Sequence, residues 1–241
     1  MSAPRISLVI PAYNEGKYIG DCLEYAIKNT CGRLHEIIVV DNASSDNTAE
    51  IARSFAGVRV VKEEKKGLTR ARQRGFLEAT GDVLAYIDAD TRMPPHWLDV
   101  VEKEFTLHKN LASLSGPYIY YDISRWRQFL VTYGWWYIGA YPLYIMIGYM
   151  LVGGNFAIRR GVLEKMGGFD TSIEFYGEDT NIARRASRFG KAKFKPSFVM
   201  YTSARRIHGE GMIKMAVVYC FSMFYEVFAK KPVSKGYIDI R

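Results

Sequence analysis

Four short apolar runs in the first part of the chain constrain its fold more than any other feature. In chain order they are ISLVI at 6–10, EIIVV at 36–40, VRVV at 58–61 and VLAYI at 83–87. A helical pattern follows each of the first three runs, and strands that are apolar on both faces and alternate with helices are typical of a parallel sheet covered on two sides. We therefore predict an α/β fold with a mostly parallel central sheet and helices on both faces.

The second half of the chain has a different pattern. It predicts, in chain order, a helix beginning near Pro94, a strand-like segment at 112–123, a strand at 155–160, a helix at Glu178–Phe189 and an apolar amphipathic helix at about 211–228. No internal repeat or linker-like segment interrupts this order, so we predict a single domain over residues 1–241.

Composition limits the class of protein. The chain is 49% hydrophobic with a formal net charge of +8, which excludes low-complexity disorder. Its three cysteines have neither disulfide-framework nor zinc-site spacing, which favours a reducing compartment. The amino terminus lacks the features of a signal peptide. The charge permits nucleic acid as a partner, but the basic residues form no recognisable nucleic-acid motif, so we predict none.

Acidic residues follow two of the predicted strands, where ligands of parallel sheets bind. Asp88 and Asp90 come directly after the strand at 83–87, and two carboxylates one residue apart can share a divalent cation; a solvated turn is the alternative. Asp41 follows the strand at 36–40 and could accept a hydrogen bond from a nucleobase. Capping of the next helix explains Ser45 and Asp46, but Asp41 lies too early for that role.

Other charged residues have two interpretations each. Arg70, Arg72 and Arg74 could bind a diphosphate or form a solvated helix face. Glu178 and Asp179 begin a predicted helix, where the helix dipole stabilises acidic side chains whatever their function.

Seven motifs in order resemble the family 2 glycosyltransferases of GT-A fold. They are PAYNE at 11–15, VVDNASSDNT at 39–48, KGLTRARQRG at 66–75, DADT at 88–91, GGNFAIRR at 153–160, GGFD at 167–170 and GED at 177–179. The resemblance covers roughly residues 6–200. It implies a Rossmann-like sheet and an inverting transferase that uses a nucleotide-diphosphate sugar and a divalent cation, Mn²⁺ or Mg²⁺.

The resemblance also implies roles for individual residues. Asp179 would be the general base. The nucleotide sugar would be bound by Pro11, Ala12, Tyr13, Glu15, Asp41, Arg72, Asp88 and Ala89. The acceptor or the donor sugar would contact Gly154, Asn155 and Glu178. The metal would be ligated by Asp90, Asp88 and His208, although a structural role for His208 is the alternative.

On this basis the domain divides into a nucleotide-binding half at about 1–91, an acceptor and catalytic half at about 92–210, and an apolar membrane-associating helix at about 211–241. The QxxRW motif of processive synthases is missing, so chain polymerisation is not expected. UDP is the expected nucleotide, with GDP and dTDP as alternatives.

Residues 128–158 contain no charged side chain and many of the aromatic residues that make up 14% of the chain. A single membrane crossing would put Asp90 and Asp179 on opposite sides, and two crossings would need roughly 40 residues. We therefore expect this stretch to be buried, re-entrant or interfacial. Its Trp and Tyr residues beside Arg125 and Arg127 favour a membrane interface, with a domain core or a homodimer face as the alternative.

These observations predict a peripheral or monotopic enzyme on the cytoplasmic face of the cell membrane, with a lipid-linked acceptor and a possible homo-oligomeric state. An inactive homologue that only docks on membranes or binds nucleotide sugars is the competing hypothesis. Nucleotidyltransferases and dinucleotide-dependent oxidoreductases would require a glycine-rich loop after the first strand, where PAYNEG stands instead.

Overall fold

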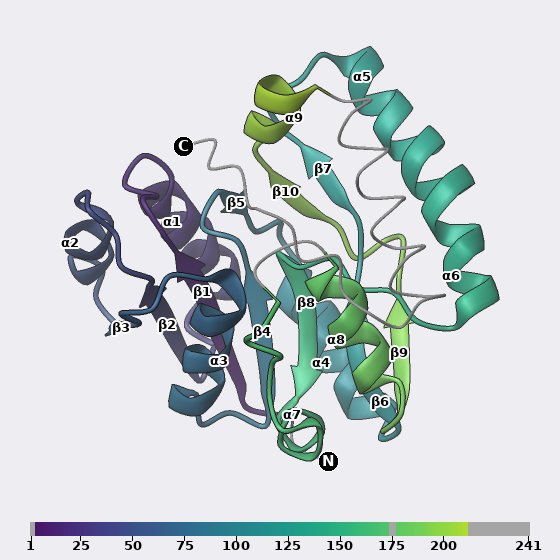
Figure 1. The fold of residues 1–241 in the computed structure, drawn as a ribbon, viewed down its shortest axis with the longest axis horizontal. Helices are drawn as coiled ribbons and strands as arrows, with labels where there is room; N and C mark the ends of the chain where they lie inside the picture. Colours follow the sequence, from purple (N-terminus) through teal and green to yellow (C-terminus); the bar gives the residue numbers. More distant parts are fainter. Residues whose placement is uncertain (1–2, 174–176, 212–241) are drawn as a thin grey trace.

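The computed structural model describes residues 3–173 and 177–211, and its centre is a seven-stranded sheet (Figure 1). The strand order is β3-β2-β1-β4-β8-β6-β9. Its strands are β1 (Ile6–Ala12), β2 (Glu36–Asp41), β3 (Val58–Lys62), β4 (Val83–Ile87), β6 (Leu111–Ser115), β8 (Asn155–Arg159) and β9 (Lys191–Phe194). The apolar helix predicted at about 211–228 lies, beyond its first residue, outside the described residues.

One strand of this sheet runs against the others. β8 pairs antiparallel with both β4 and β6, whereas the remaining pairs are parallel. The first residue of β8, Asn155, is therefore level with Ile87, the last residue of β4. Segments that precede β8 consequently reach the same edge of the sheet as the residues that follow β1, β2 and β4.

Helices cover both faces of the sheet. They are α1 (Ile19–Thr30), α2 (Thr48–Arg53), α3 (Leu68–Glu78), α4 (Trp97–Leu107), α7 (Arg160–Met166) and α8 (Glu178–Ala186). Side chains alternate along β1: Leu8 and Ile10 pack in a core with α1, α2 and α4, and Val9 packs in a second core with α3, α7 and α8. This period of two confirms the predicted α/β class with a mostly parallel, doubly covered sheet.

The segment predicted as one strand at 112–123 forms two strands in different sheets. β6 ends at Ser115, and β7 (Tyr118–Tyr120) joins a small sheet of order β5-β10-β7 with β5 (Thr91–Arg92) and β10 (Met200–Thr202). The break falls at Gly116 and Pro117. A Cβ on Gly116 would lie 1.9 Å from the carbonyl oxygen of Phe198, so the chain passes too close to its neighbour for any side chain. The last described helix is α9 (Arg205–Glu210).

The uncharged stretch forms most of a long helix on one side of the molecule (Figure 1). We call residues 125–147 the aromatic helix; it consists of α5 (Arg125–Phe129), the π-helical η1 (Leu130–Ala140) and α6 (Tyr141–Ile147). Val131, Trp136 and Ala140 face inward at spacings of five and four residues, which suits the wider π-helical turn. Within the described part of the chain, no helix combines the length and apolarity needed to cross a membrane.

Candidate active site

The candidate site lies at the edge of the sheet where β1, β2 and β4 end and β8 begins. Ala12 is paired with Asp41 across β1 and β2, and Asp88 follows β4 directly. Because β8 is reversed, the glycines that precede it also reach this edge, and Glu178 and Asp179 join them from the first turn of α8. The topology thus gathers motifs that are distant in sequence.

Arg72, on α3, is the buried cation at the centre of the site. Its side chain is 1% exposed and pairs with Glu178, which is also buried. Its guanidinium lies 3.6 Å from Oδ1 of Asp179 and 3.9 Å from Oδ1 of Asp88. Burial alone would lower the pKa of Arg72, but the three neighbouring carboxylates raise it above its usual value. Arg72 is therefore not part of a solvated helix face, and its contact with a diphosphate stays a prediction.

Gly153 and Gly154 let the backbone approach these carboxylates. A Cβ on Gly154 would lie 2.1 Å from the Tyr118 hydroxyl and 2.2 Å from Asp88, and one on Gly153 would lie 2.4 Å from Asp179. With no side chain present, the Gly153 N–H donates a 2.9 Å hydrogen bond to Oδ2 of Asp179. The other oxygen of Asp179 is buried and accepts no hydrogen bond from the described residues.

Tyr118 connects Asp88 to the aromatic helix. Its hydroxyl donates a 2.9 Å hydrogen bond to Oδ2 of Asp88, and its carbonyl oxygen accepts a 3.0 Å hydrogen bond from Nε1 of Trp136. Burial, followed by the negative charge of Asp88, raises the pKa of Tyr118, so the hydroxyl stays protonated and serves as a donor.

A second arginine, the partly buried Arg205 of α9, binds two of the motif carboxylates. Its Nη1 and Nη2 donate to Glu15 at 2.7 and 2.6 Å, and its Nε lies 2.9 Å from Oδ2 of Asp90. Burial raises the pKa of Asp90 to about 7; Arg205 opposes this rise, and repulsion from Asp88 and Glu15 adds to it. Arg205 thus joins the end of the described chain to its first loop.

The carboxylates suit a hard divalent cation. Mg²⁺ and similar ions are typically held by one or two carboxylates, with phosphate oxygens of the substrate and water completing the shell. Asp88 and Asp90 supply such a pair, and Asp88 is 36% exposed. No group of three or more His, Cys, Asp or Glu side chains suited to a metal occurs among residues 3–173 and 177–211. His208 is exposed on α9, and its role as a ligand stays a prediction.

The predicted nucleotide-binding residues come from β1 and β2 and the loops that follow them. Pro11 and Ala12 are buried at the end of β1. Tyr13 has the ammonium of Lys66 at 3.9 Å from its ring centroid. Asp41 is buried at the end of β2, and its Oδ1 accepts a 3.2 Å hydrogen bond from the N–H of Ser44, which fixes its side chain in the loop. Ala89 is buried between the two aspartates of the DADT motif.

Asn155, for which the resemblance implies a contact with the acceptor or the donor sugar, forms its hydrogen bonds within the fold. Its side chain is fully buried, where Oδ1 accepts from Nε1 of Trp97 at 2.9 Å and Nδ2 donates to the carbonyl oxygens of Phe198 and Gly116 at 2.7 and 3.1 Å. It ties β8 to the break between β6 and β7. Glu178, also expected to contact the acceptor or the donor sugar, is buried against Arg72, and both contacts stay predictions.

Two residues of the site, Tyr118 and Arg205, are not predicted by the sequence reasoning. Tyr118 lies in a segment whose pattern predicts a strand and nothing else. Arg205 lies within SARRIHGEG, where His208 is the residue that the sequence suggests as a metal ligand. A buried carboxylate such as Glu15 requires a cation partner. The sequence contains several arginines and lysines that could supply it and does not indicate that Arg205 is the one that does.

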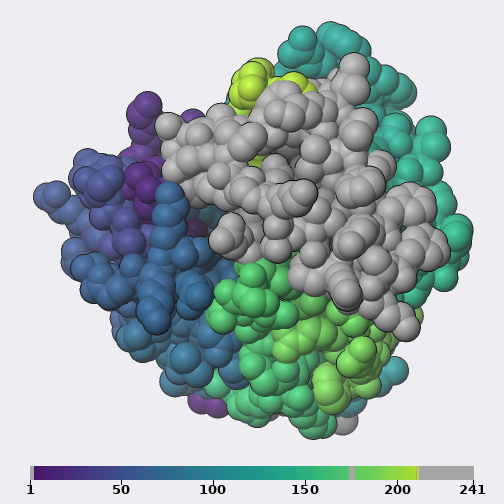
Figure 2. Space-filling view, in the orientation of Figure 1, coloured from purple at the N-terminus to yellow at the C-terminus, as the bar shows by residue number. Residues whose placement is uncertain are grey.

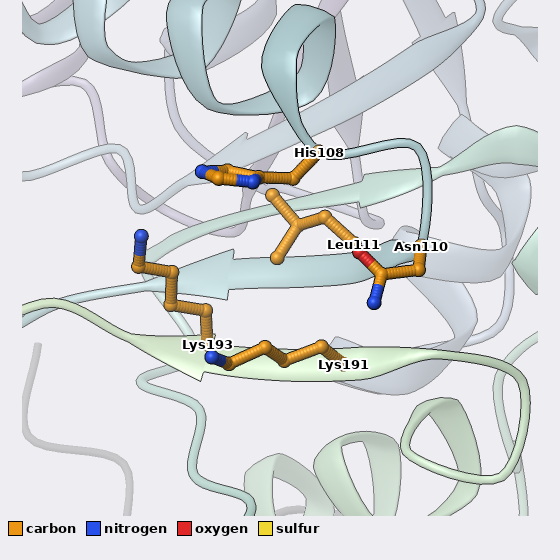
Figure 3. Close-up of a pocket in the computed structure, with 5 residues that line it drawn as sticks. All are labelled: His108, Asn110, Leu111, Lys191 and Lys193. Atoms are coloured by element: carbon orange, nitrogen blue, oxygen red, sulfur yellow. The ribbon is translucent and has the colours of Figure 1, made fainter.

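A cavity of about 180 Å³ lies at the opposite edge of the sheet (Figure 3). Figure 3 shows its lining residues, His108, Asn110, Leu111, Lys191 and Lys193. Leu111 and Lys191 begin β6 and β9, which run parallel to β4, so this cavity is remote from the carboxylates that follow β4. Lys193 is paired with Glu104 at 2.8 Å. None of the predicted site residues lines it.

Comparisons with known proteins agree with this geometry. The sequence profile described as Glycosyl transferase family 2 matches residues 7–167. The probable glycosyltransferase YdaM of Bacillus subtilis is 29% identical over 224 residues, which cover 82% of this chain and 50% of that protein. The dolichol-phosphate mannosyltransferase of Pyrococcus furiosus is 36% identical over 115 residues, which cover 46% of this chain and 32% of that protein. The chain thus spans half or less of the length of these relatives.

Among solved structures, the mannosyltransferase PcManGT of Pyrobaculum calidifontis, in complex with GDP-Man and Mn²⁺, has the same fold with a TM-score of 0.70. The likeness covers 95% of this chain and 64% of that one at 23% sequence identity. The profile match extends over most of the chain and includes six of the seven sequence motifs, either wholly or in part. The chain has the GT-A fold and belongs to glycosyl transferase family 2.

Proposed function

We propose that this protein is an inverting glycosyltransferase that moves a sugar from a nucleotide-diphosphate donor to a hydroxyl or phosphate oxygen of a lipid-linked acceptor. The observation that carries the proposal is the grouping of Asp88, Glu178 and Asp179 around buried Arg72 at the ligand-binding edge of the sheet. Family membership supports the reaction class, and a nucleotide-sugar complex of a protein with this fold supports the class of donor.

The donor would lie across the ends of β1, β2 and β4. Pro11, Ala12, Tyr13 and Asp41 would contact the nucleoside, with the Asp41 carboxylate accepting a hydrogen bond from a base N–H. Glu15 would act through Arg205, whose guanidinium it holds. Asp88 and Ala89 would lie near the ribose and the diphosphate.

Asp179 is the proposed general base. An acceptor hydroxyl has too high a pKa to attack at neutral pH, so a carboxylate must take its proton as the new C–O bond forms. The Gly153 N–H orients the Asp179 carboxylate, and the Asp179 side chain is 33% exposed, which supports access of an acceptor hydroxyl to it. Attack opposite the departing nucleotide diphosphate breaks the bond to the anomeric carbon and inverts its configuration.

Asp88 and Asp90 would hold Mn²⁺ or Mg²⁺, with His208 as a further ligand. When bound, such an ion neutralises charge on the departing diphosphate. Arg205 stands beside Asp90 in this structure and must share or release that carboxylate when a cation binds.

The proposed acceptor and location follow from the aromatic helix and one relative. A lipid-linked acceptor lies in a membrane, and the aromatic helix, which Trp136 and Tyr118 link to Asp88, exposes Trp and Tyr side chains on its outer side. The name of the Pyrococcus furiosus relative, dolichol-phosphate mannosyltransferase, indicates a lipid phosphate substrate for that protein. We infer a peripheral or monotopic protein on the cytoplasmic face of the cell membrane.

Donor hydrolysis tests the proposal without knowledge of the acceptor. A panel of UDP-, GDP- and dTDP-sugars is incubated with the full chain with and without Mn²⁺ or Mg²⁺, and the released nucleotide diphosphate is measured beside thermal shifts. We expect a metal-dependent response to one nucleotide, UDP first. Binding without hydrolysis or transfer by any donor would favour the inactive homologue instead.

A further inference from the structure

The outer side of the aromatic helix exposes an unusual number of large apolar side chains. Ile138 is 75% exposed and Met146 is 80% exposed. Other exposed members of this face are Trp126, Phe129, Leu130, Tyr133, Tyr137 and Ile145. We call these eight residues the apolar face. Soluble surfaces rarely carry so large a contiguous apolar patch unless it binds a partner or a membrane. Figure 2 shows the helix, in teal, at the surface along one edge of the molecule.

The inner side of the same helix is firmly packed. Val131, Trp136 and Ala140 form a core with Phe194 of β9, and Nε1 of Trp136 is bonded to the carbonyl oxygen of Tyr118. The apolar face is therefore presented in a fixed orientation, and its exposure does not result from a helix that lacks a packing partner.

Charge decides which partner fits this face. Arg125 and Arg127 are exposed at the start of the helix, and no charged residue follows until Arg159. A net charge of +8 attracts the chain to an anionic surface and opposes close approach of an identical copy. Trp and Tyr at the boundary of an apolar region, beside Arg, are typical of residues that lie between lipid headgroups and acyl chains.

We propose that the apolar face docks on an anionic lipid surface, with Ile138, Ile145 and Met146 in the acyl boundary and Arg125 and Arg127 among the headgroups. The inference rests on the proposed function for its link to catalysis. The path from the helix to the site is short: Trp136 bonds to Tyr118, and Tyr118 bonds to Asp88. Docking would thus place the lipid surface on the outer side of a helix whose inner side is linked through Tyr118 to Asp88.

Vesicle flotation with the full chain tests the surface. The triple variant I138Q/I145Q/M146Q removes three exposed aliphatic side chains and leaves the packed side intact. We expect it to bind phosphatidylglycerol-containing vesicles roughly 100-fold more weakly than the parent chain. The matched control is L77Q/L107Q, which removes two exposed leucines, 67% and 63% exposed, from α3 and α4. It should bind as the parent does.

A second pair of variants separates charge from apolar contact. R125Q/R127Q should weaken binding to anionic vesicles by about 25-fold at low salt, because each basic residue near an anionic surface contributes about fivefold. Its binding to uncharged phosphatidylcholine vesicles should be unchanged. If R125Q/R127Q binds both vesicle types more weakly by the same factor, Arg125 and Arg127 do not lie among the anionic headgroups.

The outcomes distinguish this inference from the proposed function. If the parent chain hydrolyses a donor but does not float with anionic vesicles, the docking surface is wrong and the transferase stands. If it floats but hydrolyses no donor, docking stands and the transferase fails. If it fails to float and forms a dimer that I138Q/I145Q/M146Q abolishes, the apolar face is a contact between two copies and the lipid proposal is overturned.

Discussion

At the scale of single residues, the site is organised by the buried Arg72 and the partly buried Arg205, each shared among carboxylates from separate segments. Arg72 forms ion pairs with Glu178, Asp179 and Asp88, and Arg205 forms ion pairs with Glu15 and Asp90. Removing one member of such a group leaves a buried charge without compensation, which costs more than the ion pair contributes. Variants at these positions must therefore be measured for stability as well as for activity.

Asp179→Asn tests the general base. The amide oxygen of Asn can still accept the Gly153 N–H, so the loop should keep its shape, but the amide cannot take a proton. We expect kcat for transfer to fall by about 10² to 10⁴, with donor affinity unchanged, because general base catalysis contributes about that factor. Steady-state kinetics and donor titration calorimetry measure the two quantities.

The control for this variant is Glu164→Gln, a carboxylate on α7 whose side chain is 57% exposed. It should keep the parental kcat. Normal turnover by Asp179→Asn would remove Asp179 from the role of base.

Arg205→Gln tests the second arginine. Its loss leaves Glu15 and Asp90 buried without their cation, and we expect the free energy of unfolding to fall by about 3 kcal/mol. Mn²⁺ should restore part of this loss by binding the freed Asp90, so the melting temperature of the variant should rise more with Mn²⁺ than that of the parent.

Arg53→Gln, at an exposed position on α2, is the matched control and should change neither quantity. An Arg205→Gln variant as stable as the parent, with no added response to Mn²⁺, would show that the arginine does not hold Asp90 in solution.

At the scale of elements, the sequence predicts the parallel part of the sheet well, because β1, β2 and β4 are apolar on both faces and require cover on each side. It predicts β8 as a strand but not its reversed direction, since direction depends on which neighbour the strand pairs with. The sequence pattern also does not predict the break between β6 and β7. Gly116 marks the break because the backbone of Phe198 passes too close to it for a side chain. That contact joins residues far apart in sequence, so the sequence pattern around Gly116 does not indicate it.

Gly154→Ala tests the turn that precedes β8. The new Cβ would overlap the Tyr118 hydroxyl and Asp88, so one of them must move. Displacement of one catalytic group by about 1 Å can cost about 10² in rate, and we expect a loss of that order in kcat/KM for the donor.

Gly161→Ala is the matched control for this variant. Gly161 lies in α7 with no atom within 4 Å of a new Cβ, so alanine there should leave activity intact and stabilise the protein by up to about 1 kcal/mol. If Gly154→Ala and Gly161→Ala are equally active, a Cβ on Gly154 does not displace Tyr118 or Asp88.

At the scale of the whole molecule, the end of the sheet opposite the site contributes pH-dependent stability. Glu36 at the start of β2 accepts hydrogen bonds from Ser7 on β1 at 2.7 Å and from the N–H and hydroxyl of Thr80 at 2.7 and 2.8 Å. Burial alone would raise the pKa of Glu36, but these bonds and Arg59 lower it to about 2.

The lowered pKa fixes the sign of the pH dependence. Because the folded carboxyl has the lower pKa, its contribution is complete above the unfolded value of 4.5 and is lost as pH falls toward about 2. Glu36→Gln should lower the free energy of unfolding by about 2 to 3 kcal/mol at pH 7 and by progressively less between pH 4.5 and 2. Urea unfolding at several pH values measures this, and a difference that is constant with pH would contradict it.

The sequence motifs name many of the residues that gather at the candidate site. They do not predict how these side chains contact one another. The motifs indicate Asp88, Asp90 and Asp179, and the structure brings Asp88 and Asp179 to the same arginine. Asn155 belongs to the same motif as Gly154, yet its buried amide is bonded to Trp97, Gly116 and Phe198, which are distant in sequence. The roles assigned to the site residues, His208 and Asp41 among them, stay predictions.

The sharing of Arg72 has a consequence for the order in which the chain is made. Arg72 and Glu178 are 106 residues apart, so at a synthesis rate of about 5 to 20 residues per second roughly 5 to 20 s pass before the main partner of the arginine exists. During that interval Asp88 is the one member of the three carboxylates around Arg72 that has been made, so a side chain that the finished protein buries still lacks most of its compensating charge. The packing around Arg72 can therefore be completed only after Glu178 and Asp179 have been made.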